Sequence, residues 1–509
     1  MDLILFTSFI PEIFLSLCIL FQLVFNAFIV NNLKNNFPII DKEAFSQTTF
    51  ILICVLLLIF NNRIEGFFSN FLFLNDISTQ YTKLLFLLSC LSVLLIIFRN
   101  FKLQKLNFFE YFSIFLLSVL ALLLLISSSD MISAYLIIEM QALAFYILAS
   151  FRRNSAFSTE SGLKYFVTGS FISGLFLFGC SLLYGILGTL NFQHLSLLLS
   201  IPFEESYSSL YYLLLIGVLL ITITFLFKIS AAPFHFWSPD VYEGAPLATT
   251  VVFSIVPKFA IFSFFIKWLC IINTIFSQVQ YLLLISGILS VFVGTFFAIR
   301  QKRVKRLVIY SSIAQVGFLV AALSVISINS LVAVYFFLTI YIITSVLVWS
   351  NISIFYSFQN KINVFYNKAQ TPLFISSLSN LFKINSLWAL SFIIIFFSIA
   401  GMPPLSGFFA KILILFSLIA TKNLIGSIFL ILISAVSVFY YLRVIKIIFF
   451  ESKENSLKTE NSLIIFNTRF LYLDCLVISS FLFLLLFIFF YPSFLLLICQ
   501  YIVLGSSFF

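Results

Sequence analysis

Charged residues are scarce in this sequence, and their scarcity excludes most soluble proteins. Asp, Glu, Lys and Arg make up 9% of the 509 residues, whereas 62% are hydrophobic. A soluble domain usually has about a quarter of its residues charged. Apolar runs of about 20 residues, long enough to cross a bilayer, recur along almost the whole chain. The short alternating segments of a membrane β-barrel are not evident, so the composition predicts an all-α membrane protein.

Metal and nucleotide motifs are also missing. The seven cysteines are scattered without a CxxC pair, which gives little support to an iron–sulfur, zinc or disulfide framework. Only two histidines occur, and no Gly-rich nucleotide fingerprint follows a strand pattern. The opening stretch, MDLILFTSFIPEIF, resembles neither a secretory signal nor a transit peptide, so we expect it to belong to the first span.

Hydropathy predicts about 14 transmembrane helices, and the basic residues orient them. The expected spans lie in 5–28, 47–62, 80–98, 110–128, 131–150, 163–188, 209–230, 247–269, 280–299, 306–327, 330–351, 387–420, 424–449 and 470–498. Twenty of the 28 Lys and Arg residues fall in or beside loops that follow odd-numbered spans. Four others, Lys83 and Lys267 among them, are expected at the opposite loops or at span edges. By the positive-inside rule both termini lie on the outer side. The net charge of +10 then reflects topology, and no nucleic-acid partner is expected.

Five ionisable residues fall inside these spans: Glu139, Lys164, Lys228, Lys258 and Lys411. A charged side chain at the bilayer centre costs at least about 2.5–3.5 kcal/mol on insertion scales. Lys164 and Lys228 lie near span ends and either snorkel to water or act in the interior. Glu139 and Lys258 lie too deep to snorkel, which leaves a static ion pair or a functional role. Lys411 follows a helix break and is either structural or functional.

Two spans are interrupted by proline and glycine. The stretch FLFKISAAPFHFWSPDVYEGAP breaks the seventh span, and SIAGMPPLSGFFAKILIL breaks the twelfth. Proline removes a helical hydrogen bond, and broken spans at corresponding positions of two halves mark the ion site of many transporters. Here the breaks fall in spans 7 and 12, each the fourth member of a five-span block (spans 4–8 and spans 9–13). Lys228 precedes the first break, whereas Lys411 follows the second break. We therefore predict two inverted five-helix repeats with discontinuous helices 7 and 12.

This pattern divides the chain into four parts. Residues 1–108 hold helices 1–3, 109–272 the first repeat, 273–452 the second repeat, and 453–509 a loop and the last helix. Just past the first break, His235 either relays protons or donates to a freed carbonyl. In the tenth span, Ser311, Ser312 and Gln315 either order water between Lys258 and Lys411 or join helices by hydrogen bonds.

Several of these stretches resemble one family. EMQALAFYIL, FKISAAPFHFWSPDVYEGAP, SIVPKFAIF, KRVKRLVIYSSIAQVGF and GMPPLSGFFAKILIL follow each other in order over roughly 130–450. They are similar to the antiporter-like membrane subunits of mitochondrial proton-pumping NADH:ubiquinone oxidoreductase, respiratory complex I. The Glu-x-Gln of Glu139 and the SPDVYEG stretch point to the subunit 2 group within that family.

The resemblance implies a role for each buried charge. Glu139 and Lys228 would form a buried pair that Lys164 modulates, Lys258 would be the central relay, and Lys411 would face the other half-channel. Many relatives have a histidine where this chain has Gln315, which leaves an amide that can order water there.

The resemblance also implies partners and a location. No cofactor is expected in this chain, so NADH, FMN, iron–sulfur clusters and ubiquinone would belong to partner subunits. The partners would be other membrane-arm subunits, including neighbouring antiporter-like ones, and membrane lipids. We expect the mitochondrial inner membrane, with both termini on the intermembrane-space side. A subunit of a multisubunit cation/proton antiporter, a membrane scaffold, and the plastid homologue of the same complex are the alternatives.

Overall fold

The computed structural model describes most of the chain. The described residues are 7–32, 37–62, 65–68, 72–104, 109–199, 208–272, 277–365, 373–379, 381–451 and 472–506. The following account refers to these residues.

The chain is almost entirely helical, as the apolar composition predicts. In lipid each backbone polar group must find its partner within the protein, and a helix satisfies this requirement internally. The long helices are α2 (Ile10–Asn32), α3 (Phe37–Asn61), α4 (Ile77–Gln104), α5 (Glu110–Ser127), α6 (Met131–Ala149), α7 (Ala156–Leu187), α9 (Ser208–Lys228), α11 (Leu247–Ile272), α12 (Ser277–Arg300), α13 (Val304–Leu323), α14 (Ile328–Phe365), α18 (Leu424–Phe449) and α20 (Tyr472–Phe490). The shorter ones are α8 (Phe192–Leu199), α10 (Trp237–Gly244), α15 (Leu381–Ile384), α16 (Ser386–Ala400), α17 (Ser406–Ala420), α21 (Pro492–Leu504) and the 3₁₀ turn η2 (Ile375–Leu378).

The number of spans agrees with the sequence prediction. Among the described residues, 12 helices are long and apolar enough to cross a membrane, and the bent pair α20–α21 raises the number to 13. The apolar helices α16 and α17 have 15 residues each. Counting them as the one interrupted span that the sequence predicts gives fourteen. The pairing of five-helix blocks as inverted repeats stays a prediction.

Two details differ from the sequence prediction. The last span was expected to be one helix over 470–498, but the chain bends by 89° between α20 and α21. Proline at the first position of a helix needs no backbone donor, so Pro492 starts α21 where α20 ends. Helix α14 also continues to Phe365, into the segment 353–385 that was expected to be a loop.

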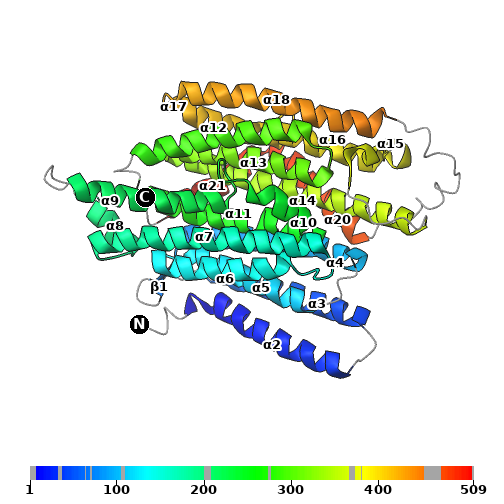
Figure 1. Ribbon diagram of the computed structural model, residues 1–509, viewed down its shortest axis with the longest axis horizontal. Coiled ribbons are helices and arrows are strands. Elements are labelled where there is room, and N and C mark those ends of the chain that lie inside the picture. The colour runs from blue at the N-terminus through cyan, green and yellow to red at the C-terminus, as the bar shows by residue number, and fades with distance from the viewer. Residues whose placement is uncertain are drawn as a thin grey trace. The chain divides into compact units, whose positions relative to one another are not determined.

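The chain forms two compact units, which we describe separately. The first comprises Met1–Leu94, Gln104–Leu283 and Ile498–Phe509, and the second comprises Leu95–Leu103 and Leu284–Leu497. In the first unit α5, α6, α7 and α9 pack each against the next (Figure 1). Helix α11 packs on α5, and every one of its residues except Cys270 is buried. In the second unit the buried helix α14 contacts α13, α17 and α20. A helix that is apolar on all sides belongs in a core.

A small hairpin completes the first unit. Strands β1 (Gly66–Phe68) and β2 (Phe73–Asn75) pair antiparallel, with Gly66 opposite Asn75. The Leu72 carbonyl beside β2 accepts a hydrogen bond from the Ser129 amide at 3.0 Å, which ties the hairpin to the turn between α5 and α6. Asp130 then caps α6, because its carboxylate accepts from the Ile132 amide at 2.9 Å.

Candidate functional site

The predicted break of the seventh span lies at the end of α9, and Lys228 is its last residue. The Ser230 amide donates to the Phe227 carbonyl, and the Ala231 amide to the Leu226 carbonyl, both at 2.9 Å. Ser230 has a φ of 60°, so these bonds form a Schellman motif. Because the last turn of a helix carries partial negative charge, this position favours the ammonium form of Lys228.

Helix α10 closes the break from the other side. The indole Nε1 of Trp237 donates to the Phe227 carbonyl at 3.0 Å. The Ser238 amide and hydroxyl both donate to the His235 carbonyl, at 3.1 and 3.0 Å. The prolines therefore interrupt the helix without leaving these carbonyls unpaired, and the break is an ordered part of the fold.

Glu139 lies on α6, within Coulombic range of Lys228. No direct ion pair joins the two in the described part of the chain, and the Oε1 atom of Glu139 is buried without a hydrogen-bond partner. Lys228 also lines a small cavity whose volume is about 10 Å³, close to the minimum for one water. The other lining residues are Tyr135, Ile138, Ile172, Ser173, Phe176, Thr224 and Phe225. Glu139 does not line this cavity, so the two residues lie within Coulombic range of each other without a direct contact, and their action as a buried pair stays a prediction.

Lys164 has other partners. Its ammonium lies 2.7 Å from Glu160 Oε1, one helical turn away on α7, and 3.5 Å from Asp240 Oδ2 on α10. Glu160 and Lys164 are four residues apart and therefore share one face of α7. The Lys164 side chain is 47% exposed, and in the described residues no ion pair joins it to Glu139. Lys164 thus links α7 to α10, the helix that closes the break.

Lys258 is buried near the middle of α11, with 4% of its surface exposed. It lies 11 residues from the start and 14 from the end of the helix, or about 16 and 21 Å along the axis. The preceding Pro257 has no amide to donate to the Phe253 carbonyl. Tyr242 of α10 donates its hydroxyl to that carbonyl instead, at 3.0 Å. Helix α10 is therefore bonded both to the end of α9 beside Lys228 and to the turn of α11 before Lys258.

An aromatic cluster packs around α10. Trp237 stacks on Tyr165 of α7 with ring centroids 5.0 Å apart, and Tyr242 meets Trp237 edge-on at 5.9 Å. Tyr146 of α6 contacts Tyr165 edge-on, and its hydroxyl is buried without a hydrogen-bond partner. Glu139 also lies within Coulombic range of Tyr146. The cluster places the short helix α10 firmly between α6, α7 and α11.

His235 lies inside the break between α9 and α10 and is 4% exposed. Its Nδ1 atom is buried without a hydrogen-bond partner, and its ring lies 4.3 Å from that of Phe236. The imidazole also has a backbone hydrogen bond with Pro233. Both roles considered from the sequence therefore stay predictions, because the unpartnered Nδ1 suits a relay and the bond to Pro233 suits donation to a freed carbonyl.

The second break lies in the other unit and begins with the same motif. The Gly401 amide donates to the Ser398 carbonyl, and the Met402 amide to the Phe397 carbonyl, at 3.1 and 3.0 Å. Gly401 has a φ of 81°, so α16 also ends in a Schellman motif. Lys411 of α17 reaches back and donates from Nζ to the Ala400 carbonyl at 2.6 Å. In both breaks a lysine lies at the carboxyl end of the helix that precedes the break.

Gly401 also makes space for this lysine. A Cβ atom at position 401 would lie 2.7 Å from Lys411 Cδ and 3.0 Å from Nζ. The ammonium lies 5.4 Å from the centroid of the Phe318 ring, on α13. Glycine is therefore needed here for its left-handed backbone and for the missing side chain.

The polar residues of α13 serve mainly as links between helices. Ser311 is hydrogen-bonded to Tyr441 of α18, and Ser312 to Tyr341 of α14. This favours the second of the two roles that the sequence left open for these serines. Gln315 is half-buried on the same helix. Its ordering of water toward Lys258 and Lys411 stays a prediction.

Two further lysines lie near helix ends, as the sequence analysis expected, but they are buried. Lys83 lies six residues into α4 and Lys267 five residues from the end of α11, and they are 2% and 9% exposed. Their side chains turn toward neighbouring helices instead of toward water. Glu12, the partner of Lys83, was not considered at all, although a carboxylate two residues into an apolar span is a usable signal.

The described residues also bear on metal binding. They contain no group of three or more His, Cys, Asp or Glu side chains placed to hold a metal ion. The ionisable groups at and near the two breaks are a carboxylate, an imidazole and several amines, which can exchange protons.

Comparison with known proteins identifies the family. A family model described as "NADH:quinone oxidoreductase/Mrp antiporter, TM" matches residues 128–440, more than half of the chain. NADH-quinone oxidoreductase subunit N of Pelagibacter ubique is 37% identical over 458 residues, which cover 89% of this chain and 92% of that protein. NADH-ubiquinone oxidoreductase chain 2 of Marchantia polymorpha is 32% identical over 455 residues, covering 88% and 89%.

Solved structures show the same fold. A chain of respiratory complex I from Thermus thermophilus aligns with a TM-score of 0.74 at 24% identity, covering 96% of this chain and 98% of that one. A chain of the Mrp complex from Dietzia sp. aligns with a TM-score of 0.77 at 15% identity, covering 98% and 97%. From the sequence matches and this shared architecture, the chain belongs to the NADH:quinone oxidoreductase/Mrp antiporter family of membrane subunits.

Proposed function

We propose that this chain is a proton-translocating membrane-arm subunit of NADH:ubiquinone oxidoreductase and that it performs no redox chemistry itself. Its relatives over nine-tenths of the chain are named as subunits of this enzyme. NADH, FMN, iron–sulfur clusters and ubiquinone are then held by partner subunits. The neighbours of this chain are other membrane-arm subunits, antiporter-like ones among them, and lipids. It lies in the mitochondrial inner membrane, with both termini on the intermembrane-space side.

One observation supports the proton path above all others. The Oε1 of Glu139 is buried without a hydrogen-bond partner, and Lys228, at the end of a broken helix, lies within Coulombic range of Glu139 without touching it. A structural ion pair would be expected in direct contact with its hydrogen-bonding capacity filled, because a buried unpaired polar atom costs about 1–3 kcal/mol. An acid and an amine that lie close together without a direct contact can instead exchange a proton when they approach or when a water enters between them.

The first half of the path works through the break. Lys228 is the last residue of α9 and lies within Coulombic range of Glu139. A movement of α10 that withdraws Trp237 from the Phe227 carbonyl loosens the end of α9 and so shifts Lys228 relative to Glu139. Because α10 is also bonded through Tyr242 to the turn before Lys258, the same movement reaches the next amine along the path. His235, inside the break, offers a ring nitrogen between these steps.

The second half of the path ends at Lys411. Its ammonium is held by the Ala400 carbonyl at the end of α16, where the helix dipole favours a cation. A proton that arrives at Lys411 therefore meets a site prepared for positive charge. Loss of the hydrogen bond to Ala400 then favours release of the proton from Lys411.

A direct test uses single variants in the assembled enzyme. We expect Glu139→Gln and Lys228→Met to lower proton pumping and NADH oxidation together by about 10²-fold, the usual effect of losing a positioned proton-transfer group. Lys446→Met, at an exposed lysine of α18, is the matched control and should pump normally. Pumping is followed in proteoliposomes by quenching of a pH-sensitive dye. Wild-type pumping in both site variants would refute the proton path.

A native gel separates this proposal from the antiporter alternative. If the chain is a complex I subunit, it migrates in a band that oxidises NADH. If it belongs to a multisubunit cation/proton antiporter, it migrates with other membrane subunits in a band without that activity. If the chain is only a scaffold, the Glu139→Gln and Lys228→Met complexes that assemble turn over at the wild-type rate. Any loss is then in the amount of assembled complex.

A further inference from the structure

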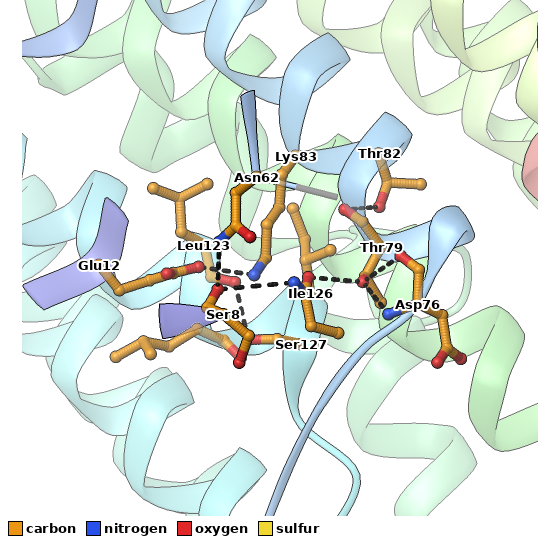
Figure 2. Close-up of polar contacts among 12 residues, drawn as sticks. Ser8, Glu12, Asn62, Asp76, Thr79, Thr82, Lys83, Leu123, Ile126 and Ser127 are labelled. Atoms are coloured by element: carbon orange, nitrogen blue, oxygen red, sulfur yellow. Dashed lines mark hydrogen bonds and ion pairs between the residues drawn. The ribbon is translucent and has the colours of Figure 1, made fainter. Parts of the chain in front are cut away.

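A second group of buried charges lies at one end of the first unit, away from the breaks. Glu12, in the first turn of α2, accepts a hydrogen bond from the ammonium of Lys83 of α4 at 2.6 Å. The two residues are 4% and 2% exposed. Figure 2 shows the two side chains pointing toward one another, beside Asn62 and Ser8. Asn62 donates to the Ser8 carbonyl at 2.9 Å and so fixes the chain just before α2.

Lys267 of α11 joins this group. It donates from Nζ to the carbonyl of Ile126, near the carboxyl end of α5. Asp76, just before α4, and Lys83 both lie within Coulombic range of it. The charged groups that face one another here thus come from α2, α4 and α11 and from the residue before α4, and they comprise two acids and two amines. The carboxyl end of α5 supplies a further partial negative charge.

The position of the group is shallow, but its side chains turn inward. At 1.5 Å per residue, Glu12 lies about 3 Å from the start of α2, Lys83 about 9 Å from the start of α4, and Lys267 about 7.5 Å from the end of α11. A lysine at this depth can extend its stem to water. Both lysines are nevertheless buried, so snorkelling does not explain them.

One oxygen of the Glu12 carboxylate has no hydrogen-bond partner. Its Oε1 holds Lys83, whereas its Oε2 is buried and has no hydrogen-bond partner. An ion pair with only a structural purpose would fill both oxygens, because a carboxylate accepts up to four hydrogen bonds. The free oxygen can accept a proton and release it again.

Helix α11 connects this group to the centre of the unit. Lys258 and Lys267 are nine residues apart, which is about 14 Å along the helix axis. We propose that Glu12 and Lys83, assisted by Lys267, form a second proton-carrying site, through which protons pass between the region of Lys258 and the aqueous phase at this end of the unit. The inference rests on the proposed function only in taking Lys258 as a proton carrier.

The transfer itself is a simple proton exchange. The Nζ–H bond of Lys83 breaks, its electron pair stays on the nitrogen, and an O–H bond forms on Glu12. The acid then gives this proton to water, and Lys83 takes up the next one. Lys267 lies within Coulombic range of Lys83 and keeps a second amine beside the pair. On the topology predicted from the basic residues, this end faces the outer side.

Two variants test the proposal in the assembled complex. Glu12→Gln keeps an oxygen that accepts from Lys83 but no longer ionises. Lys83→Arg keeps the ion pair, but a guanidinium does not release its proton. We expect both to assemble and to lower pumping and NADH oxidation about tenfold or more. Glu110→Gln, at an exposed carboxylate of α5, is the matched control and should behave as wild type.

Infrared difference spectra of the resting complex between acid and neutral pH give a readout that does not depend on turnover. We expect a carboxylic-acid C=O band in the wild type and in Glu110→Gln that is missing in Glu12→Gln. Wild-type pumping in either site variant overturns the proposal, and so does the absence of that band. If Glu12→Gln does not assemble, pumping by Lys83→Arg decides the question. If neither variant assembles, the ion pair is structural and the proposal is overturned. Wild-type pumping in Lys228→Met counts against the proposed function and leaves the infrared result for Glu12 untouched.

Discussion

Replacement of Gly401 by alanine probes the second break without removing any charge. A non-glycine residue in the left-handed conformation costs about 1–2 kcal/mol. The new Cβ would lie 2.7 Å from Lys411 Cδ, so the lysine must leave the Ala400 carbonyl. This backbone cost lowers stability wherever the lysine lies, whereas a hydrogen bond to a charged group contributes about 1.5–3 kcal/mol to the native position of Lys411. We therefore expect the native position of Lys411 to lose at least about tenfold in population.

The assay is proton pumping in proteoliposomes that contain the assembled complex, with Gly188→Ala as the matched control. Gly188 ends α7 with a φ of 71° and has nothing within 4 Å of an added Cβ. The Gly188→Ala variant incurs the same backbone cost without touching a lysine, so it should reduce stability and leave pumping unchanged.

A double-mutant cycle then assigns the effect to the lysine. If Gly401→Ala acts through Lys411, it has no further effect on pumping in a Lys411→Met background. Equal losses in Gly401→Ala and Gly188→Ala, or a full additional loss in the double variant, would refute the reasoning.

Two further predictions concern Tyr242 of α10 and the Glu160–Lys164 pair of α7. Tyr242→Phe leaves the buried Phe253 carbonyl without its donor, so we expect a loss of about 1–3 kcal/mol, seen as a lower thermal midpoint, whereas Tyr81→Phe at an exposed tyrosine should have no effect. Glu160→Gln removes an ion pair that is half open to solvent, so stability should change by less than about 1 kcal/mol, and a larger loss that persists in high salt would contradict this account.

The helices and their breaks were predictable because their signals are local. Apolar length sets each span, and proline and glycine mark where a span stops. The break after Lys228 and the one at Gly401 lie where the sequence places them. The bend between α20 and α21 was missed because the apolar run continues through it, and Pro492 alone marks the new helix.

The directions of the charged side chains were not predictable in the same way. Whether a lysine near a span end snorkels or turns inward depends on the helix beside it, and that is a tertiary property. Lys164 lies out at the surface with Glu160 and Asp240, whereas Lys83 and Lys267 are buried. All three lie near a predicted span boundary, and the sequence does not show which of them turns inward.

The two breaks end their first helices with the same hydrogen bonds but with different residues. Gly401 adopts its left-handed conformation freely, whereas Ser230 does so against the preference of an L-amino acid, at about 1–2 kcal/mol. The first break therefore carries a backbone cost that the second lacks. The hydrogen bond from Trp237 to the Phe227 carbonyl offsets part of that cost, so the closed form of the first break depends on α10, whereas the second break has no such cost to offset.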